Sequence, residues 1–188
     1  MTFRYTLTAL ALTALALPAA ADTLDLNLSG DAFQAGYIRD LPPEGLEAGA
    51  SVLVHDDDGE LLEGELHLVD NPEPGRDALL LGIGGKLIVA NDDVRKADGA
   101  AIAIGGKLNW TLPQYNRAGV AASLYYAPSV TSMSDIDGYQ SYAVQGEFKV
   151  LQDARVYLGW RNIELSYDDK GNDRDFEDGV YGGFRVDF

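Results

Sequence analysis

A two-residue alternation of apolar with polar or small side chains constrains the fold of this chain more than any other feature. The final segment, residues 180–188, shows the alternation most clearly. Its apolar face carries Val180, Gly182, Phe184, Val186 and Phe188. Its other face carries Tyr181, Gly183, Arg185 and Asp187. Successive side chains of a β-strand point to opposite faces, so the pattern predicts a strand with one apolar face.

The same pattern recurs along the chain in segments near the 9–11 residues that a tilted membrane strand requires. Clusters of Gly, Asp, Asn and Pro separate the segments, as expected for turns. The alternation slips near Asn162 and Ile163, which indicates a bulge or the point where the strand leaves the bilayer. The predicted strands are residues 24–29, 32–41, 50–54, 60–70, 78–89, 100–110, 118–127, 139–151, 154–165 and 180–188.

Ten such strands predict an all-β protein, a closed antiparallel up-and-down transmembrane β-barrel. An even number of strands brings both termini of a closed barrel to the same side of the membrane. Eight strands would remain if the first two segments lay outside the wall. After the N-terminal segment no run of 18 apolar residues occurs, so the sequence predicts no transmembrane helix.

The N-terminus predicts export. Arg4 precedes an apolar run from Leu7 to Leu17, and small residues follow up to Ala21; these are the parts of a cleavable signal peptide. The run is shorter than the roughly 20 apolar residues that a membrane-spanning helix needs. We therefore expect residues 1–21 to be a signal peptide and residues 22–188 to form one barrel domain.

The chain is strongly acidic. Its net charge is −16, and removal of Arg4 with the signal peptide makes the mature chain −17. Nucleic-acid binding needs a basic surface and is not expected. The sequence contains no cysteine, which leaves no thiol for a disulfide, a metal site or a lipid anchor.

The acidic residues are concentrated in the turns at one end of the predicted barrel. If Phe188 lies at the periplasmic rim, the outward connections are residues 56–59, 91–99, 128–138 and 168–178, and the periplasmic ones are 42–44, 70–77, 113–116 and 152–153. The outward connections are longer on the whole, as in known transmembrane barrels. They could hold divalent cations loosely through carboxylate oxygens, but neither 56–59 nor 135–138 has the spacing of a calcium loop.

The C-terminal segment resembles the assembly signal of outer-membrane barrels of Gram-negative bacteria. Those proteins commonly end on an aromatic residue with apolar residues at every second position before it, as Val180, Phe184, Val186 and Phe188 do here. The resemblance implies that the barrel-assembly machinery binds the last strand. It also implies a location in the outer membrane, in contact with lipid and lipopolysaccharide, and we expect a monomer.

The order of strands and turns resembles the YfaZ family of predicted outer-membrane proteins over nearly the whole mature chain. The segments that carry the resemblance, together with the terminal strand, are LDLNLS (24–29), HDDDG (55–59), LGIGGK (81–86), YYAPS (125–129) and VYLGWR (156–161). The family implies a fold and a location. It implies no established activity and supplies no functional residues.

The predicted inward face carries charges of both signs. They are Glu63, Glu65, Lys86, Lys107, Glu147, Lys149, Arg161 and Arg185. Unpaired charges in a narrow, poorly hydrated lumen would be costly, so we predict a mutually paired polar core. Barrels of about 8 strands are nearly filled by side chains, whereas open channels appear near 16–18 strands. Ten strands therefore favour a plugged or very narrow lumen over a general porin.

No motif points to a catalytic, cofactor or metal site, and we expect no enzyme. Ile-Gly-Gly-Lys-Leu occurs at 83–87 and again at 104–108, but leucine after the lysine rules out a phosphate-binding loop. The repeat fits two similar neighbouring strands whose glycines allow close packing. His67 with Ser51 is the one conceivable base and nucleophile of a hydrolase, and nothing in the sequence brings them together.

Three functions remain open at this point. The first is an outer-membrane barrel with a structural, envelope or narrow small-solute role. The second is a soluble periplasmic barrel that binds a small apolar ligand inside, which would reverse the two faces of every strand. The third is an outer-membrane lipid hydrolase that uses Ser51 and His67.

Overall fold

The structure, a computed structural model, describes residues 22–72, 78–92, 94, 96–167 and 174–188. The predicted signal peptide, 1–21, lies outside these residues. Ten strands form the wall: β1 (Asp22–Leu28), β2 (Ala32–Leu41), β3 (Leu46–His55), β4 (Gly59–Asp70), β5 (Leu79–Asp92), β6 (Ala97–Leu112), β7 (Tyr115–Ala127), β9 (Ile136–Lys149), β10 (Ala154–Tyr167) and β11 (Arg174–Asp187). A short 3-10 helix, η2 (Ser129–Thr131), and β8 (Ser132–Ser134) lie between β7 and β9.

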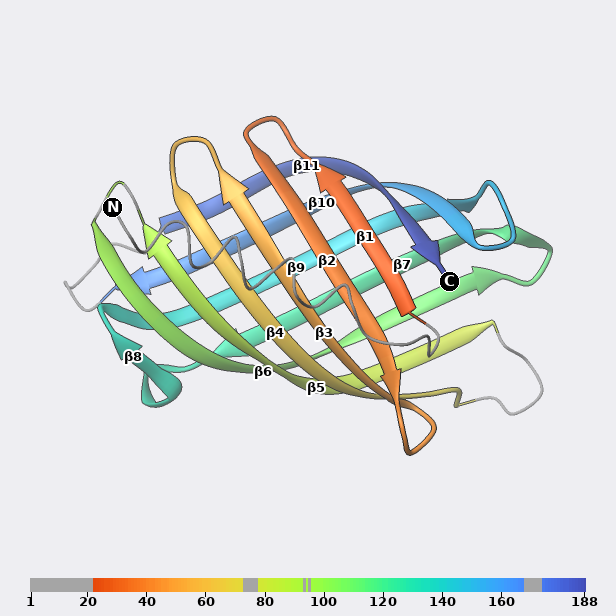
Figure 1. Cartoon of the computed structure of the whole chain (residues 1–188), viewed down its shortest axis with the longest axis horizontal. Coiled ribbons are helices and arrows are strands. Elements are labelled where there is room, and N and C mark those ends of the chain that lie inside the picture. The colour runs from red at the N-terminus through yellow and green to blue at the C-terminus, as the bar shows by residue number, and fades with distance from the viewer. Residues whose placement is uncertain (1–21, 73–77, 93, 95, 168–173) are drawn as a thin grey trace.

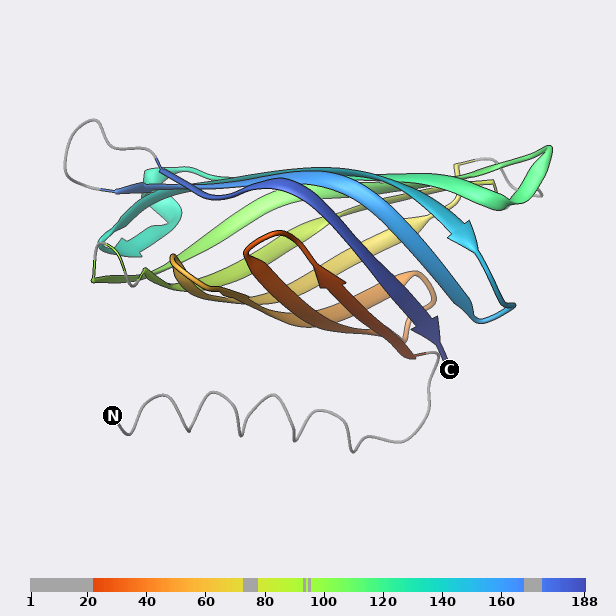
Figure 2. The same cartoon turned by 90° about the horizontal axis from the view of Figure 1, so that it is seen from above.

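The sheet closes on itself. Each wall strand pairs antiparallel with its chain neighbours, and β1 pairs with β11, so that Leu24 lies opposite Val186. The first residue of β1 and the last residue of the chain complete the seam, because the amide of Asp22 donates to the carbonyl of Phe188 at 3.0 Å and the reverse bond measures 2.9 Å. Figure 2 shows β1 and β11 side by side at the C-terminus. The prediction of a closed antiparallel ten-strand barrel is confirmed.

The barrel has two distinct ends, visible in Figure 1. We call one the termini end, because it carries Asp22, the first described residue, and the C-terminal Phe188; the β2–β3, β6–β7 and β9–β10 turns also lie there. The β8 end carries β8, η2 and the acidic β3–β4 turn at residues 56–58. Among the residues of the described ranges, no helix is long and apolar enough to cross a membrane.

The outer face of the wall is apolar. Ile83 is 70% exposed and Ile104 69% exposed, and Leu158, Val180 and Phe184 also face outward. Charged and polar side chains at the alternate positions turn inward instead, and His67 and Glu63 are buried there. A soluble barrel would bury the apolar set and expose the charges. This distribution excludes the soluble carrier and fits a wall surrounded by lipid.

The strands are longer than the alternation predicted. β3 begins at Leu46 rather than residue 50, and β11 begins at Arg174 rather than residue 180. The connections at 91–99 and 168–178 are correspondingly shorter than predicted. The extension of β11, residues 174–179, is mostly polar, so alternation alone does not reveal it; at the start of β3, by contrast, Leu46 and Ala48 do alternate with Glu47. The predicted bulge is confirmed, with a register shift between Ile163 and Glu164.

Candidate functional site

The lumen collects the predicted inward charges. Glu63, Glu147 and Arg161 are buried, and Glu65, Lys86, Lys107 and Arg185 are half-buried. Lys149 is the exception, because it ends β9 at the termini end, where its side chain is exposed. Seven of the eight predicted residues therefore meet partners inside the barrel.

Glu63 on β4 is the centre of the first cluster. Lys86 on β5 places its Nζ 3.0 Å from Oε2 of Glu63. The Ser51 hydroxyl donates to the same oxygen at 3.2 Å, and the Tyr139 hydroxyl donates to Oε1 at 2.8 Å. Lys86 also lies 3.6 Å from Glu65. A carboxylate with this many donors can stay ionised although it is buried.

Arg185 on β11 is the centre of the second cluster. Its Nη2 lies 2.7 Å from Asp25 of β1, and its Nη1 lies 3.4 Å from Glu147 of β9. Arg155 continues the cluster toward the termini end, 2.8 Å from Asp187 and 3.7 Å from Glu147. The pairs join β1, β9, β10 and β11 across the seam where the barrel closes.

Two further pairs complete the ionic part of the lumen. Arg161 lies 2.9 Å from Glu177 and also donates to Asn27 at 2.9 Å, while its guanidinium stacks 4.7 Å from the Tyr181 ring centroid. Lys107 of β6 pairs with Glu47 of β3. Every wall strand except β2 and β7 thus contributes a charged group to the pairs described in this subsection.

Sequence reasoning missed several partners. They are Asp25, Glu47, Arg155 and Glu177. Asp25 could have been found, since it alternates with Leu24 and Leu26 in the clean first strand. Glu47 and Glu177 fall in the strand extensions that the apolar pattern did not predict. The alternation within one strand does not show which residue of another strand forms an ion pair with it.

The repeated Ile-Gly-Gly-Lys-Leu segments lie opposite each other. Gly84 on β5 pairs with Gly105 on β6. The side chains of His67 from β4 and Tyr125 from β7 meet above this glycine pair, and 2.7 Å separates the His67 Nε2 from the Tyr125 hydroxyl. A Cβ on Gly84 would lie 2.7 Å from the His67 ring, and one on Gly105 would lie 2.6 Å from the Tyr125 ring. The glycines therefore make room for two inward rings.

The hydrolase pair is not assembled. Ser51 lies opposite Glu63, whereas His67 lies opposite Glu47. Four residues along β3 separate the two positions, a distance of about 13 Å at the usual rise of a strand. Both side chains already have other partners, Glu63 and Tyr125 respectively. Nucleophile and base need direct hydrogen-bond contact, which this register prevents.

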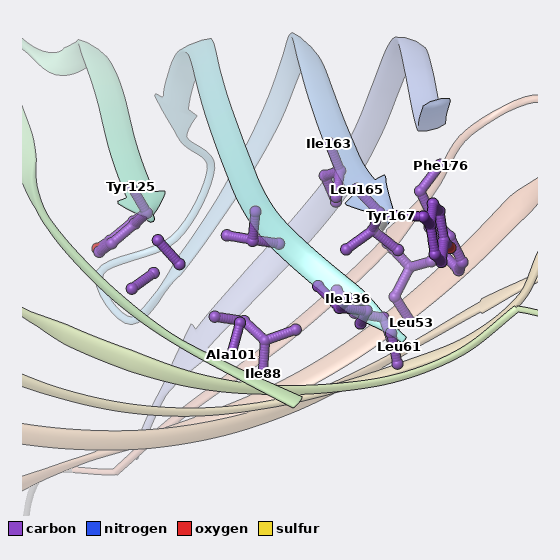
Figure 3. Close-up of a cluster of buried hydrophobic side chains, with 14 of the residues drawn as sticks. Leu53, Leu61, Ile88, Ala101, Tyr125, Ile136, Ile163, Leu165, Tyr167 and Phe176 are labelled. Carbon is purple, nitrogen blue, oxygen red and sulfur yellow. The ribbon is translucent and has the colours of Figure 1, made fainter. Parts of the chain in front are cut away.

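Apolar side chains fill the lumen toward the β8 end (Figure 3). We call this cluster the seal: Ala32, Leu53, Leu61, Ile88, Ala90, Ala101, Ala103, Tyr125, Ala127, Ile136, Tyr139, Ile163, Leu165, Tyr167 and Phe176. Its members come from β2 to β7 and β9 to β11. The expectation of a polar lumen is therefore corrected in part, because most inward positions near the β8 end are apolar; buried Asp92, which accepts a hydrogen bond from Tyr167 at 2.6 Å, is an exception. The ionic clusters occupy the rest.

Two cavities lie beside the ionic clusters. The larger, about 320 Å³, is lined by Asp40, Glu47, Lys107 and Arg155 among others, and Asp40 is exposed at its mouth near the termini end. The smaller, about 190 Å³, lies deeper, against Glu63, Ser141 and Arg161. Both touch Lys86, Gln145 and Arg185, so they adjoin. Within the described ranges, no group of three or more His, Asp or Glu residues could hold a metal ion.

A closed wall with an apolar exterior and an ionic interior defines a transmembrane β-barrel. A family model described as YfaZ precursor matches residues 3–188, and the chain belongs to the YfaZ family. The curated "Outer membrane protein YfaZ" of Escherichia coli (strain K12) is 28% identical over 110 residues, which is 58% of this chain and 59% of that relative. The match thus spans less than two thirds of the relative. The family places this chain in the outer membrane.

Among solved structures, two porins are similar. The KdgM porin aligns at a TM-score of 0.44 and 9% identity, covering 90% of this chain and 99% of that chain. The NanC porin aligns at a TM-score of 0.48 and 8% identity, covering 89% and 98%.

Proposed function

We propose that this outer-membrane barrel admits small polar solutes to its lumen from the termini end and is closed at the β8 end by the seal. The seal carries the proposal: Leu53, Leu61 and Ile88 are fully buried inside the barrel, where a general porin would have water. Hydrophobic constrictions of this kind block conduction because water leaves them. A general porin is not supported.

The chemistry of the cavities favours polar solutes. Acidic side chains come mainly from β1 to β4, as Asp25, Asp40 and Glu65 do, whereas basic ones come from β5, β6, β10 and β11. The two signs therefore line neighbouring parts of the cavity wall, where they meet in the ion pairs described above. The electrostatic field of these groups would orient a small solute that has its own dipole. A purely apolar solute would gain no binding energy from entering the lumen.

Recording across planar bilayers tests the role of the seal. The wild-type barrel should show no stable, large conductance. Leu61→Ala with Ile88→Ala removes apolar bulk from the seal and should produce measurable conductance. Leu62→Ala with Leu87→Ala is the matched control, because these neighbours face outward, and it should behave as wild type. A large conductance in the wild type would overturn the proposal.

The filled lumen also favours a second candidate, a purely structural envelope barrel. Solute uptake into liposomes separates the two. For a solute barrel, the seal variant should let small polar solutes pass and the outward control should not. If the seal variant folds but neither conducts nor passes solute, the structural role is favoured.

We further propose that the barrel is a monomer whose outer face contacts lipid and lipopolysaccharide directly. Apolar side chains on β5, β6, β10 and β11, such as Ile83, Ile104 and Leu158, are exposed on that face. The acidic turns at the β8 end would meet divalent cations only loosely, through solvated carboxylates. Sedimentation in detergent at several protein concentrations tests the monomer, and a concentration-dependent dimer would contradict it.

A further inference from the structure

One part of the seal differs from the rest in how it is held. Most members lie within long wall strands, but Ile136 is the first residue of the wall strand β9, and only Asp135 separates it from β8. It is 3% exposed and packs against the backbone of Gly99, where a Cβ would lie 2.6 Å from its Cγ1. We call residues 128–136 the flap. The flap therefore inserts one apolar side chain into the end of the lumen.

The flap replaces a wall strand over a short stretch. β7 pairs with β6 only as far as Ile104, opposite Tyr126. Beyond that point β6 pairs with β8 instead, through Gly99, Ala100 and Ala101 only. The neighbouring β5–β6 ladder runs without interruption from Leu79 to Asp92. The wall between β6 and β9 is thus closed at the β8 end by a three-residue ladder.

Apart from Ile136, which pairs with Tyr167 at the end of the β9–β10 ladder, few contacts fix the flap. Val130 is 87% exposed and Met133 60% exposed, and no residue of η2 is buried. The next backbone bond, from Asp135 to Asp98, is long at 3.4 Å. Ser134 has a φ of 65°, which a residue other than glycine seldom adopts. A segment with few buried contacts and a short ladder opens at a lower free-energy cost than the wall around it.

We infer that the flap is the gate of the lumen: when β8 leaves β6, Ile136 loses its contact with Gly99 and the seal opens between β6 and β9. The inference rests on the proposed function, because it states where the sealed route opens. The surrounding strands need not move, since they remain paired on both sides along the rest of their length. Hydrophobic gates open when a passage widens enough to hold water.

A reversible cross-link tests the gate, and the absence of native cysteine makes the test specific. Ala100 and Met133 are register partners on β6 and β8, at a separation that a disulfide can span. The pair is introduced together with Ile136→Ala. Under reducing conditions this variant should open several-fold more often than wild type. Oxidation should remove the added openings, and reduction should restore them.

The control places a cysteine pair at Leu108 and Ala122, register partners of β6 and β7 in the fixed wall. There, oxidation in the same Ile136→Ala background should change nothing. If oxidation of the flap pair leaves the openings unchanged, the flap is not the gate. If Ile136→Ala fails to fold, as judged by heat-modifiable migration, Ile136→Val takes its place with a smaller expected rise. Equal openings in that variant and wild type would also overturn the inference.

The two proposals fail in different ways. If Leu61→Ala with Ile88→Ala conducts while the flap variants do not, the seal closes the lumen but the flap does not gate it. If the seal variant does not conduct, the proposed solute route itself is wrong.

Discussion

Gly84 and Gly105 face each other on β5 and β6, and each approaches the carbonyl oxygen of a neighbouring strand closely. A Cβ on Gly84 would lie 2.0 Å from the Leu66 oxygen, and one on Gly105 would lie 2.0 Å from the Leu124 oxygen. Real side chains do not approach backbone so closely, so the strands would have to separate. That separation would also pull apart the His67–Tyr125 hydrogen bond above the pair.

We predict that Gly84→Ala and Gly105→Ala each lower the free energy of unfolding by about 1–3 kcal/mol or more, the range found for overpacked interiors. Gly64→Ala is the matched control, because no atom lies within 4 Å of the added Cβ. Urea unfolding in detergent, followed by far-UV circular dichroism, measures the difference. A loss at Gly64 as large as that at Gly84 would contradict the role of close approach.

Glu63 and Lys86 form a well-enclosed ion pair in the lumen, with side-chain exposures of 6% and 13%. We predict that Lys86→Met costs about 3–5 kcal/mol, because it leaves a buried carboxylate without its cation. Adding Glu63→Gln should recover part of that loss, since it removes the buried carboxylate that lost its cation, while Glu65 stays charged. Lys149→Met, at an exposed position, should stay within about 0.5 kcal/mol of wild type. Additive losses at Glu63 and Lys86 would show that the two groups do not interact.

At the scale of the element, the apolar face of each strand could be predicted and its ends could not. β9 and β10 match the predicted segments closely. β3 and β11 extend further: the extension of β11 is mostly polar, whereas that of β3, residues 46–49, is short and contains Glu47 as its one polar residue. β8 was not predicted, because a three-residue strand carries too little alternation to distinguish it from a turn.

The last strand offers a prediction about assembly. Val180, Phe184 and Phe188 all face outward, and we propose that the barrel-assembly machinery binds this face before β11 pairs with β1. Phe188→Ser should lower the yield of heat-modifiable barrel in the outer membrane. Leu151→Ser is the control, since Leu151 is equally exposed at the termini end but lies outside β11. Equal losses for both variants would point to general hydrophobicity instead of a terminal signal.

At the scale of the whole molecule, the lumen has an ionic half and an apolar half, and only the ionic half was predicted. Charged residues reveal the inward face because they contrast with outward leucines. Near the β8 end both faces are apolar: Leu61 points inward beside outward Leu62, and Ile88 inward beside outward Leu87. Adjacent apolar residues erase the two-residue period, so the sequence alone cannot assign them to lipid or lumen.

The ionic half carries a net negative charge, which should make the lumen ion-selective once the seal is opened. The cavities are lined by the carboxylates of Asp25, Asp40, Glu47, Glu63, Glu65 and Asp187, against the bases Lys86, Lys107, Arg155, Arg161 and Arg185. Glu147 and Glu177 pair with the same arginines and add further negative charge. A pathway with excess carboxylate concentrates cations and excludes anions. Leu61→Ala with Ile88→Ala should therefore conduct with a preference for cations.

Reversal potentials in a salt gradient measure that preference. Asp40→Asn removes an exposed carboxylate at the cavity mouth and should shift the reversal potential toward that of a nonselective pore. Asp70→Asn is the control, because Asp70 ends β4 at the same end of the barrel but points outward from the lumen, and it should leave the potential unchanged. An equal shift for both variants would mean that rim charge, and not the lumen, sets selectivity. Raising the salt concentration should weaken the Asp40 effect, since a partly exposed carboxylate is screened over about 8–10 Å at physiological ionic strength.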